Sequence, residues 1–215
     1  MSNFEIGFEL VENEVAFVDR LQVGSEEAFE TLMHLYQAAI YNIAYRVLGD
    51  PAEAADAVQE TFMKIFKGIK AFRGDCGLKT WIYTIAISES LNRQRWWKRW
   101  RRRAPFSIDE RNELDPVASR LLEVPDSGPT PEAACARIET EQAVQQALNS
   151  LAFEHRIVIV LRDIEGLSYE EIAEMLGLSL GTVKSRLWRG RLELKKKLEP
   201  YIAAPQSTAS ERLAG

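Results

Sequence analysis

Apolar residues recur every three or four positions along most of this chain, which is the spacing of helices that bury one face. No segment shows a convincing alternation of apolar and polar residues, the pattern of a half-buried strand. The sequence therefore predicts an all-α protein. We expect two small helical domains joined by a flexible linker, with four helices in the C-terminal domain.

The N-terminal domain is expected over residues 15–103. Its predicted helices cover residues 15–23, 25–48, 51–70 and the stretch from about residue 80 onward. Ser25 can cap the second helix, and Asp50 followed by Pro51 is an N-cap with proline at the first helical position. Residues 71–79 contain two glycines that break the pattern, so a loop is predicted there.

The helix predicted over residues 51–70 has two distinct faces. Its apolar stripe, expected to be buried, comprises Val58, Phe62, Ile65, Phe66 and Ile69. Its opposite face carries Asp56, Gln59, Glu60, Met63 and Lys67. On pattern alone, an ordinary solvated face is the favoured interpretation of that second set.

Residues 166–189 have the pattern of a helix-turn-helix. Ser168 and Glu171 form a capping box, and Gly177 supplies a stop before a second helix that Ser179 can cap. One face of that second helix holds Leu180, Val183, Leu187, Gly190, Leu194 and Leu198. The other holds Lys184, Ser185, Arg186, Trp188 and Arg189, a set that can read guanine edges or hold phosphates in the major groove. The alternative is a helical hairpin with a charged, solvated face.

Charge is distributed unevenly along the chain. The net charge is −5, yet residues 93–103 carry seven basic residues and no acid, and residues 184–197 carry seven with only Glu193 against them. Two such segments on an acidic body predict two contacts with nucleic acid. In the first segment three tryptophans alternate with the cations and can stack on unpaired bases; amphipathic packing with a solubilising tail is the alternative.

A linker separates the two domains. Residues 104–131 hold five of the eight prolines and six acidic residues against two arginines, which favours an extended segment over 104–130. The C-terminal domain is then expected over 131–200, where Pro200 ends the last helix, and residues 201–215 are expected to be a disordered tail.

Composition excludes several classes of function. Two cysteines and two histidines lack zinc-ligand spacing, and no nucleophile–base set or glycine-rich phosphate loop is present, so we predict no enzyme, metal or cofactor. No apolar run reaches the ~20 residues of a membrane span, and the acidic N-terminus lacks the features of a signal peptide. A cytoplasmic protein without direct membrane insertion is expected.

The order of three segments then points to a family. DAVQETFMKIF is followed by FRGDCGLKTWIYTIA, a basic segment, a linker and LSYEEIAEMLGLSLGTVKSRLWRGR. Over residues 15–198 this arrangement resembles the extracytoplasmic-function (ECF) sigma factors, the minimal two-domain specificity subunits of bacterial RNA polymerase. The runner-up is an autonomous helix-turn-helix regulator that binds an operator and needs neither the DAVQETF helix nor the acidic linker.

The resemblance implies a role for each domain. The C-terminal domain would bind the −35 promoter element through Thr182, Lys184, Ser185, Arg186, Trp188 and Arg189. The N-terminal domain would bind core RNA polymerase through Asp56, Gln59, Glu60, Met63 and Lys67, which replaces the solvated-face interpretation. It would capture and melt the −10 element through Arg73, Asp75, Lys79, Thr80, Trp81, Asn92, Arg93, Arg95 and Trp96.

The resemblance also implies partners. These are the clamp of the largest polymerase subunit, the flap of the second largest, promoter DNA and an anti-sigma factor. The chain departs from the family pattern at Ser88, Glu89, Ser90 and Asn92, four polar residues on the helix expected to read the −10 element. Cys76, between two glycines, is expected to be exposed at the tip of the −10 loop, as a tolerated small residue or as a redox-sensitive thiol.

Overall fold

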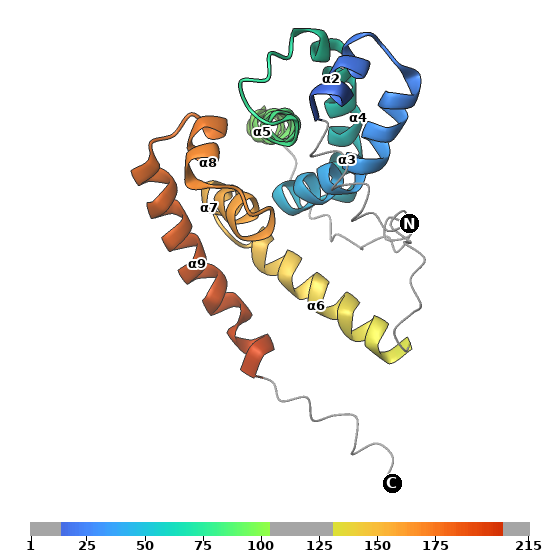
Figure 1. The fold of residues 1–215 in the computed structure, drawn as a ribbon. Coiled ribbons are helices and arrows are strands. Elements are labelled where there is room, and N and C mark those ends of the chain that lie inside the picture. The colour runs from blue at the N-terminus through green and yellow to red at the C-terminus, as the bar shows by residue number, and fades with distance from the viewer. Residues whose placement is uncertain (1–13, 104–130, 204–215) are drawn as a thin grey trace. The chain divides into compact units, whose positions relative to one another are not determined.

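The structure is a computed structural model that describes residues 14–103 and 131–203 (Figure 1). All regular elements in these two ranges are helical, and none of their helices is long and apolar enough to cross a membrane. The chain divides into two compact units, residues 1–124 and 125–215. The expected linker over 104–130 and the tail from 204 lie outside the described residues.

The part of unit 1 that the structure describes, residues 14–103, contains four α-helices and a short 3-10 turn. They are α2 (Glu14–Gln22), α3 (Glu26–Leu48), α4 (Pro51–Gly68), η1 (Ile69–Ala71) and α5 (Leu78–Arg103). Helices α3, α4 and α5 pack against one another, while α2 packs on α3 and η1. Their shared core contains fully buried Leu21, Leu32, Ile40, Ile43, Ile65, Ile82 and Ile87.

Local capping explains where the helices of unit 1 begin and end. The Ser25 side chain accepts the Ala28 N–H, and the Asp50 carboxylate accepts the Glu53 N–H at 2.9 Å. Gly49 ends α3 in the left-handed conformation, with φ of 80°, which glycine adopts without Cβ strain. These caps confirm the starts and stops that were predicted from the sequence.

The expected buried face of α4 is wrong at one position. Phe66 is 63% exposed, whereas Val58 and Ile65 are buried. Its ring instead lies 5.0 Å from that of Phe29 on α3, so the two aromatics pack on each other at the surface of the unit.

Unit 2 contains α6 (Pro131–Asn149), α7 (Phe153–Ile159), the π-helical turn η3 (Val160–Ile164), α8 (Tyr169–Leu176) and α9 (Leu180–Ala203). Helices α6, α7 and α8 all contact α9. The core of the unit is formed by Leu148, Ile157, Val158, Ile159, Leu161, Ile172, Val183 and Leu187.

Two expectations for unit 2 are corrected. Helix α9 continues through Pro200 to Ala203, because a proline in the last turn removes a single N–H donor near a helix end. Leu180, expected on the buried face, is 40% exposed because it opens α9 beside the turn. In α6, residues 137–142 all face solvent, and Ile138 among them is 49% exposed.

Candidate nucleic-acid interface

Helix α9 presents one face to the core of unit 2 and another to solvent. Val183 is fully buried and Leu187 is 2% exposed. Gly190 lies so close to α7 that an added Cβ would come within 2.7 Å of Ile159 Cδ1. This glycine therefore permits the close approach that holds α9 in place.

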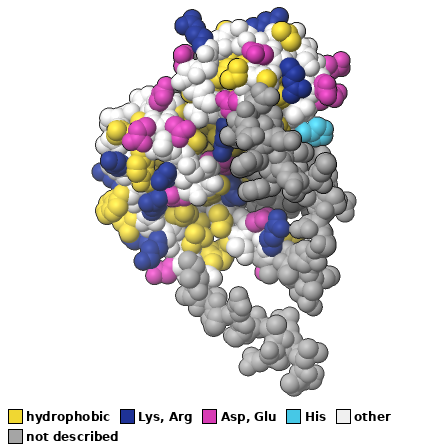
Figure 2. All heavy atoms as spheres, in the orientation of Figure 1, with side chains coloured by type: hydrophobic (Ala, Val, Ile, Leu, Met, Phe, Trp, Pro, Cys, Tyr) yellow, Lys and Arg dark blue, Asp and Glu magenta, His cyan; other side chains and the backbone are white. Residues whose placement is uncertain are grey.

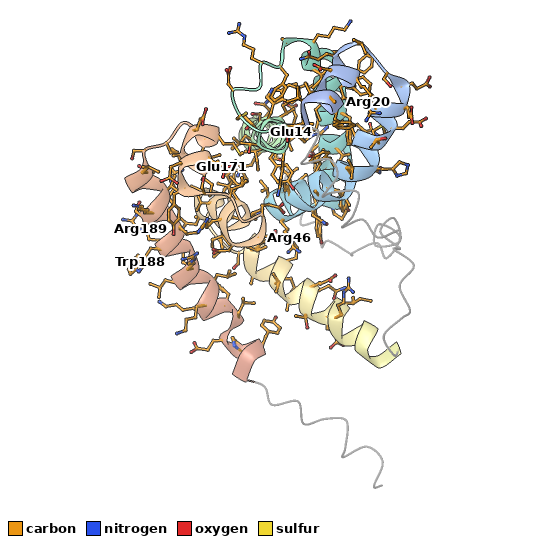
Figure 3. All side chains as sticks on the ribbon, in the orientation of Figure 1. Glu14, Arg20, Arg46, Glu171, Trp188 and Arg189 are labelled. Carbon is orange, nitrogen blue, oxygen red and sulfur yellow. The ribbon has the colours of Figure 1, made fainter. Side chains whose placement is uncertain are left out.

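The outer face of α9 carries the residues predicted to bind the −35 element. Lys184, Ser185, Trp188 and Arg189 are exposed, while Thr182 and Arg186 are partly buried. Trp188 and Arg189 project outward from the helix (Figure 3), and Figure 2 shows Lys and Arg side chains together with hydrophobic ones over α9, at the left of the view. An exposed helix face with several cations and a flat aromatic side chain matches the chemistry of DNA grooves.

The turn before α9 has the predicted capping chemistry. The Ser168 side chain accepts the Glu171 N–H at 3.1 Å, and the Glu171 carboxylate accepts the Ser168 N–H at 2.8 Å. Gly177 ends α8 with φ of 63°, and Ser179 accepts the Thr182 N–H at 3.2 Å. The Thr182 hydroxyl lies 2.8 Å from that of Ser179, so Thr182 takes part in capping the helix as well as lying at the candidate interface.

Two cations lie over the ring of Tyr169, beside this turn. The Arg162 guanidinium lies 4.8 Å and the Lys184 ammonium 5.9 Å from the centre of its ring, which are cation–π distances. Arg191 of α9 is held by Asp163, whose hydrogen bond is the main cause of the raised pKa of Arg191. The basic surface of α9 therefore continues toward η3 and α8.

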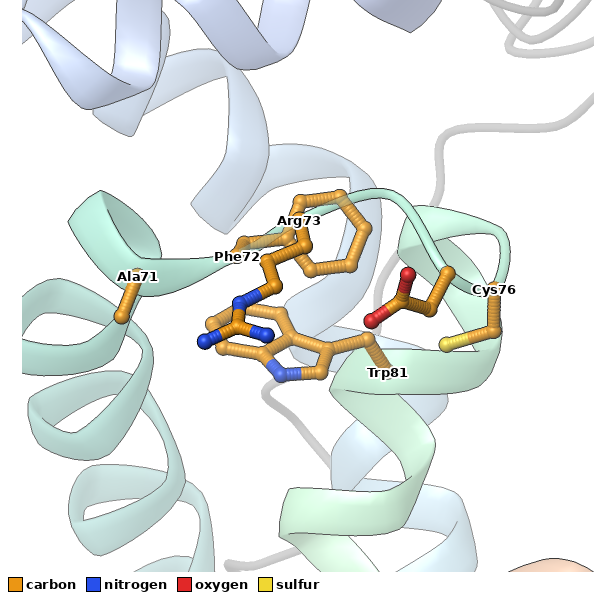
Figure 4. Close-up of a pocket in the computed structure, with 6 residues that line it drawn as sticks. Ala71, Phe72, Arg73, Cys76 and Trp81 are labelled. Carbon is orange, nitrogen blue, oxygen red and sulfur yellow. The ribbon is translucent and has the colours of Figure 1, made fainter.

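In unit 1 a cavity of about 290 Å³ opens where α5 begins (Figure 4). It is lined by Ala71, Phe72, Arg73, Asp75, Cys76 and Trp81. The Phe72 and Trp81 rings are 5.0 Å apart at an angle of 45°, and the Trp81 indole also packs against Gly68, where an added Cβ would lie 3.4 Å away. An aromatic wall beside one cation and one acid can stack a flat ring and hydrogen-bond to its edge.

This cavity brings together three of the residues predicted to bind the −10 element: Arg73, Asp75 and Trp81. Ala71 and Phe72 also line the cavity. Neither was among the individual residues predicted to bind the −10 element, although the FRGDCGLKTWIYTIA segment that points to the family begins at Phe72. Cys76 also lines the cavity and is partly buried rather than fully exposed, which corrects the expectation for its side chain.

The remaining residues predicted to bind the −10 element lie along α5, away from that lining. Lys79 lies 5.3 Å from the centre of the Tyr83 ring, and Asn92 donates to Glu89 at 3.3 Å. Thr80 is partly buried on the first turn of α5. The side chains of Arg95 and Trp96 lie outside the described part of the chain.

Arg93 points toward α4. Its guanidinium donates to Glu53 at 2.7 Å and to Asp56 at 3.2 Å. Burial would lower the pKa of Arg93, but hydrogen bonding to Glu53 and the charges of both acids raise it above its usual value. Arg93 therefore links the helix expected to read DNA to the helix expected to bind polymerase.

Two of the polar residues that depart from the family pattern belong to the interior of unit 1. Glu89 is 7% exposed and is paired with Lys64 of α4, while Ser90 is fully buried and donates to the Ala86 carbonyl at 2.9 Å. Because Glu89 and Ser90 are buried and bonded within unit 1, their departure from the family pattern does not concern the choice of a −10 base.

The predicted polymerase-binding residues share one exposed surface on α4. Asp56, Gln59, Glu60, Met63 and Lys67 are all exposed, and Met63 retains 50% of its accessible surface. Phe66 is exposed beside them, whereas helical periodicity had assigned it to the buried stripe. This surface combines charge, amides and apolar area, as protein interfaces do.

Comparison with known proteins extends across both units. The sigma-70 region 2 family model matches residues 32–104, and the sigma-70 region 4 model matches residues 141–194. The RNA polymerase sigma-H factor of Pseudomonas aeruginosa is 35% identical over 191 residues, covering 89% of this chain and 96% of that protein. The ECF RNA polymerase sigma-E factor of Haemophilus influenzae is 34% identical, covering 87% and 96% respectively.

Solved structures agree with these relatives. The sigma factor RpoE of Bartonella quintana, determined with the anti-sigma factor NepR, superposes with a TM-score of 0.62 at 27% identity, covering 80% of this chain and 96% of that one. CnrH, determined with the cytosolic domain of CnrY, has a TM-score of 0.59 at 23% identity, covering 86% and 96%, which supports the fold. An autonomous regulator that used only the helix-turn-helix would not account for similarity along both units.

Proposed function

We propose how the two units of this chain, which belongs to the ECF sigma factor family, divide the recognition of a promoter. As a sigma factor the chain directs RNA polymerase to promoters and is not itself an enzyme. In the proposal, unit 1 binds the clamp of core polymerase and captures the −10 element. Unit 2 binds the −35 element as duplex and contacts the flap.

One observation carries this division: the two candidate DNA surfaces have different shapes and lie in different units. The cavity of unit 1 is a recess with an aromatic wall, which suits an unpaired base. The outer face of α9 in unit 2 is the exposed side of a helix that carries several cations, from which Trp188 and Arg189 project, and this suits the major groove of a duplex. These features support capture of unpaired bases by unit 1 and duplex binding by unit 2.

The residues of unit 1 take two roles in this proposal. Arg73, Asp75 and Trp81 hold an unpaired base, while Lys79, Thr80, Asn92, Arg95 and Trp96 follow the strand along α5. Asp56, Gln59, Glu60, Met63 and Lys67 on α4 contact the clamp. Arg93, assigned to the −10 contact from the sequence, stabilises the junction between α4 and α5 because its guanidinium donates to Glu53 and Asp56, both on α4.

An anti-sigma factor is the further partner that we propose. The Bartonella quintana sigma factor, similar to this chain over 80% of its length, was determined with one bound. Because RNA polymerase acts on the bacterial chromosome, we also place this chain in the cytoplasm.

Run-off transcription with purified core polymerase and a randomised promoter library tests the division. Trp81→Ala should blur the selected −10 motif and leave the −35 motif intact, whereas Arg189→Ala should do the reverse. A Glu199→Ala variant, exposed on the same helix as Arg189 but outside the basic segment, is the control and should select the parental motifs. If both site variants blurred the same motif, the division would be wrong.

A further inference from the structure

Helix α2 lies outside the matched family region, which begins at residue 32, yet it contacts both ends of the loop that forms the cavity. The loop runs from the end of η1 to the start of α5. Gln22, the last residue of α2, donates through its side-chain amide to the Phe72 carbonyl at 2.9 Å and the Ile69 carbonyl at 3.2 Å. One side chain of α2 therefore bonds to the N-terminal end of the loop.

Glu14, at the opposite end of α2, bonds to the C-terminal end of the loop. Its carboxylate accepts the Leu78 N–H, the first backbone donor of α5, at 2.9 Å. The first N–H groups of a helix have no partner within the helix, and the helix dipole favours negative charge there. Burial, and then the charge of Glu14, raise the pKa of Tyr36 on α3, so this carboxylate also acts on α3.

The body of α2 is anchored independently of these contacts. Phe17 is 3% exposed and Leu21 is fully buried, so the helix is fixed to unit 1 by its apolar face. A rigid helix that bonds residues 69, 72 and 78 fixes the separation of the two loop ends, between which Arg73, Asp75 and Cys76 line the cavity. Loops with few packing contacts open locally unless such bonds restrain them.

We propose that Glu14 and Gln22 are positioning residues for promoter melting: α2 holds the loop of residues 72–77 in the shape that captures an unpaired base. The role in DNA capture rests on the function proposed above for the cavity. The restraint on the loop does not, because it concerns contacts within the free protein.

The reactivity of Cys76 measures this restraint without DNA. In a Cys135→Ser background Cys76 is the only cysteine, so its reaction with Ellman's reagent reports how often the loop opens. Glu14→Ala and Gln22→Ala should each raise the reaction rate roughly fivefold, the effect of losing one typical hydrogen bond. Glu30→Ala and Gln37→Ala, which change the same residue types at exposed positions of α3, should leave it unchanged.

A conservative variant separates positioning from general stability. Glu14→Gln keeps a side-chain oxygen that can accept the Leu78 N–H, so its Cys76 rate should lie closer to the parent than that of Glu14→Ala. Circular dichroism melts identify any variant that fails to fold. If an alanine variant fails to fold, the Cys76 reaction rate of Glu14→Gln alone tests the proposal. A parental Cys76 rate in the folded Glu14→Ala, Gln22→Ala double variant would overturn the proposal.

Melting of a library-selected promoter by the holoenzyme completes the experiment. The Glu14→Ala and Gln22→Ala variants should open this promoter less than the parent does when the same fraction of core polymerase is occupied. If Cys76 reacts faster but opening is unchanged, α2 does restrain the loop and the assigned role of the cavity is what fails. If the variants opened the promoter less while Cys76 reacted at the parental rate, the proposed restraint of the loop by α2 would be refuted.

Discussion

Arg93 on α5 donates to Asp56 on α4 at 3.2 Å, so a residue assigned to DNA binding is paired with one assigned to polymerase binding. The same guanidinium holds Glu53 at 2.7 Å. Lys64 and Glu89 make a second ion pair between the two helices, and Glu89 is almost completely buried. The two candidate surfaces of unit 1 therefore belong to one packed pair of helices, and a mutation on one can act through the other.

We expect Asp56→Ala combined with Gln59→Ala to weaken binding to core polymerase while duplex −35 binding by the same full-length chain is retained. Both side chains are exposed on α4, so their loss removes polar contacts without opening the core of unit 1. Titration of labelled protein with core polymerase measures the effect.

Two controls isolate that result. Glu30→Ala with Gln37→Ala changes the same types of side chain on α3 and should bind core normally. Arg93→Gln removes the ion pair with Asp56 while leaving the α4 surface unaltered, so it too should bind core like the parent. If Arg93→Gln reproduced the loss, Asp56 would act by supporting α5 and its assigned contact with the clamp would be mistaken.

The sequence was sufficient where structure depends on neighbours in the chain. Asp50 with Pro51, the Ser168–Glu171 box and Gly177 were recognised because capping needs only three or four adjacent residues. Phe66 was misplaced because a helical period gives the direction of a side chain, but not whether another element covers that direction.

Contacts between distant segments were beyond the reach of the sequence pattern. Glu14 and Leu78 are separated by 64 positions, and Lys64 and Glu89 by 25. Glu89 seemed to belong to a DNA-reading surface because helical wheels cannot show that α4 supplies an ammonium partner. The cavity itself was foreseen as a loop with glycines, but its aromatic wall depends on Phe72 and Trp81 meeting in space.

Gly190→Ala should destabilise unit 2 and reduce −35 binding. The new Cβ would lie 2.7 Å from Ile159 Cδ1 and 3.1 Å from His155 Cβ, and such overpacking costs about 1–3 kcal/mol of unfolding free energy. Hydrogen exchange of the α7 and α9 amides measures this loss within unit 2 alone.

Gly181→Ala is the matched control for the change at Gly190. The nearest neighbour of its Cβ would be Ser179 Oγ at 3.9 Å, and alanine favours helix over glycine by about 1 kcal/mol, so α9 should not be weakened. Ile159→Val removes the clashing Cδ1 and should restore part of the stability that Gly190→Ala loses. Additive losses in the double variant would show that the contact with Ile159 is not the cause.

Arg189→Ala or Arg186→Ala should weaken binding to the −35 element. A bidentate contact to a guanine is worth ~1–3 kcal/mol and its loss relaxes specificity at one base pair, whereas loss of a phosphate contact weakens all sequences alike. Competition with single-base variants at two salt concentrations separates these cases, because phosphate contacts set the salt dependence. Parental affinity in both variants would contradict the docking of α9.

A bulky adduct on Cys76 should block promoter opening while sparing polymerase and −35 binding. Cys76 lines the cavity with Trp81 and Arg73, so an alkyl group on its sulfur would occupy the space assigned to an unpaired base. Cys76→Ser is close in size and should support opening under reducing conditions. The measurement is permanganate footprinting of the promoter with an alkylated Cys135→Ser protein, compared with a reagent-treated Cys76→Ser, Cys135→Ser control that offers no thiol. Normal melting with Cys76 fully alkylated would mean that the unpaired base is held elsewhere on unit 1.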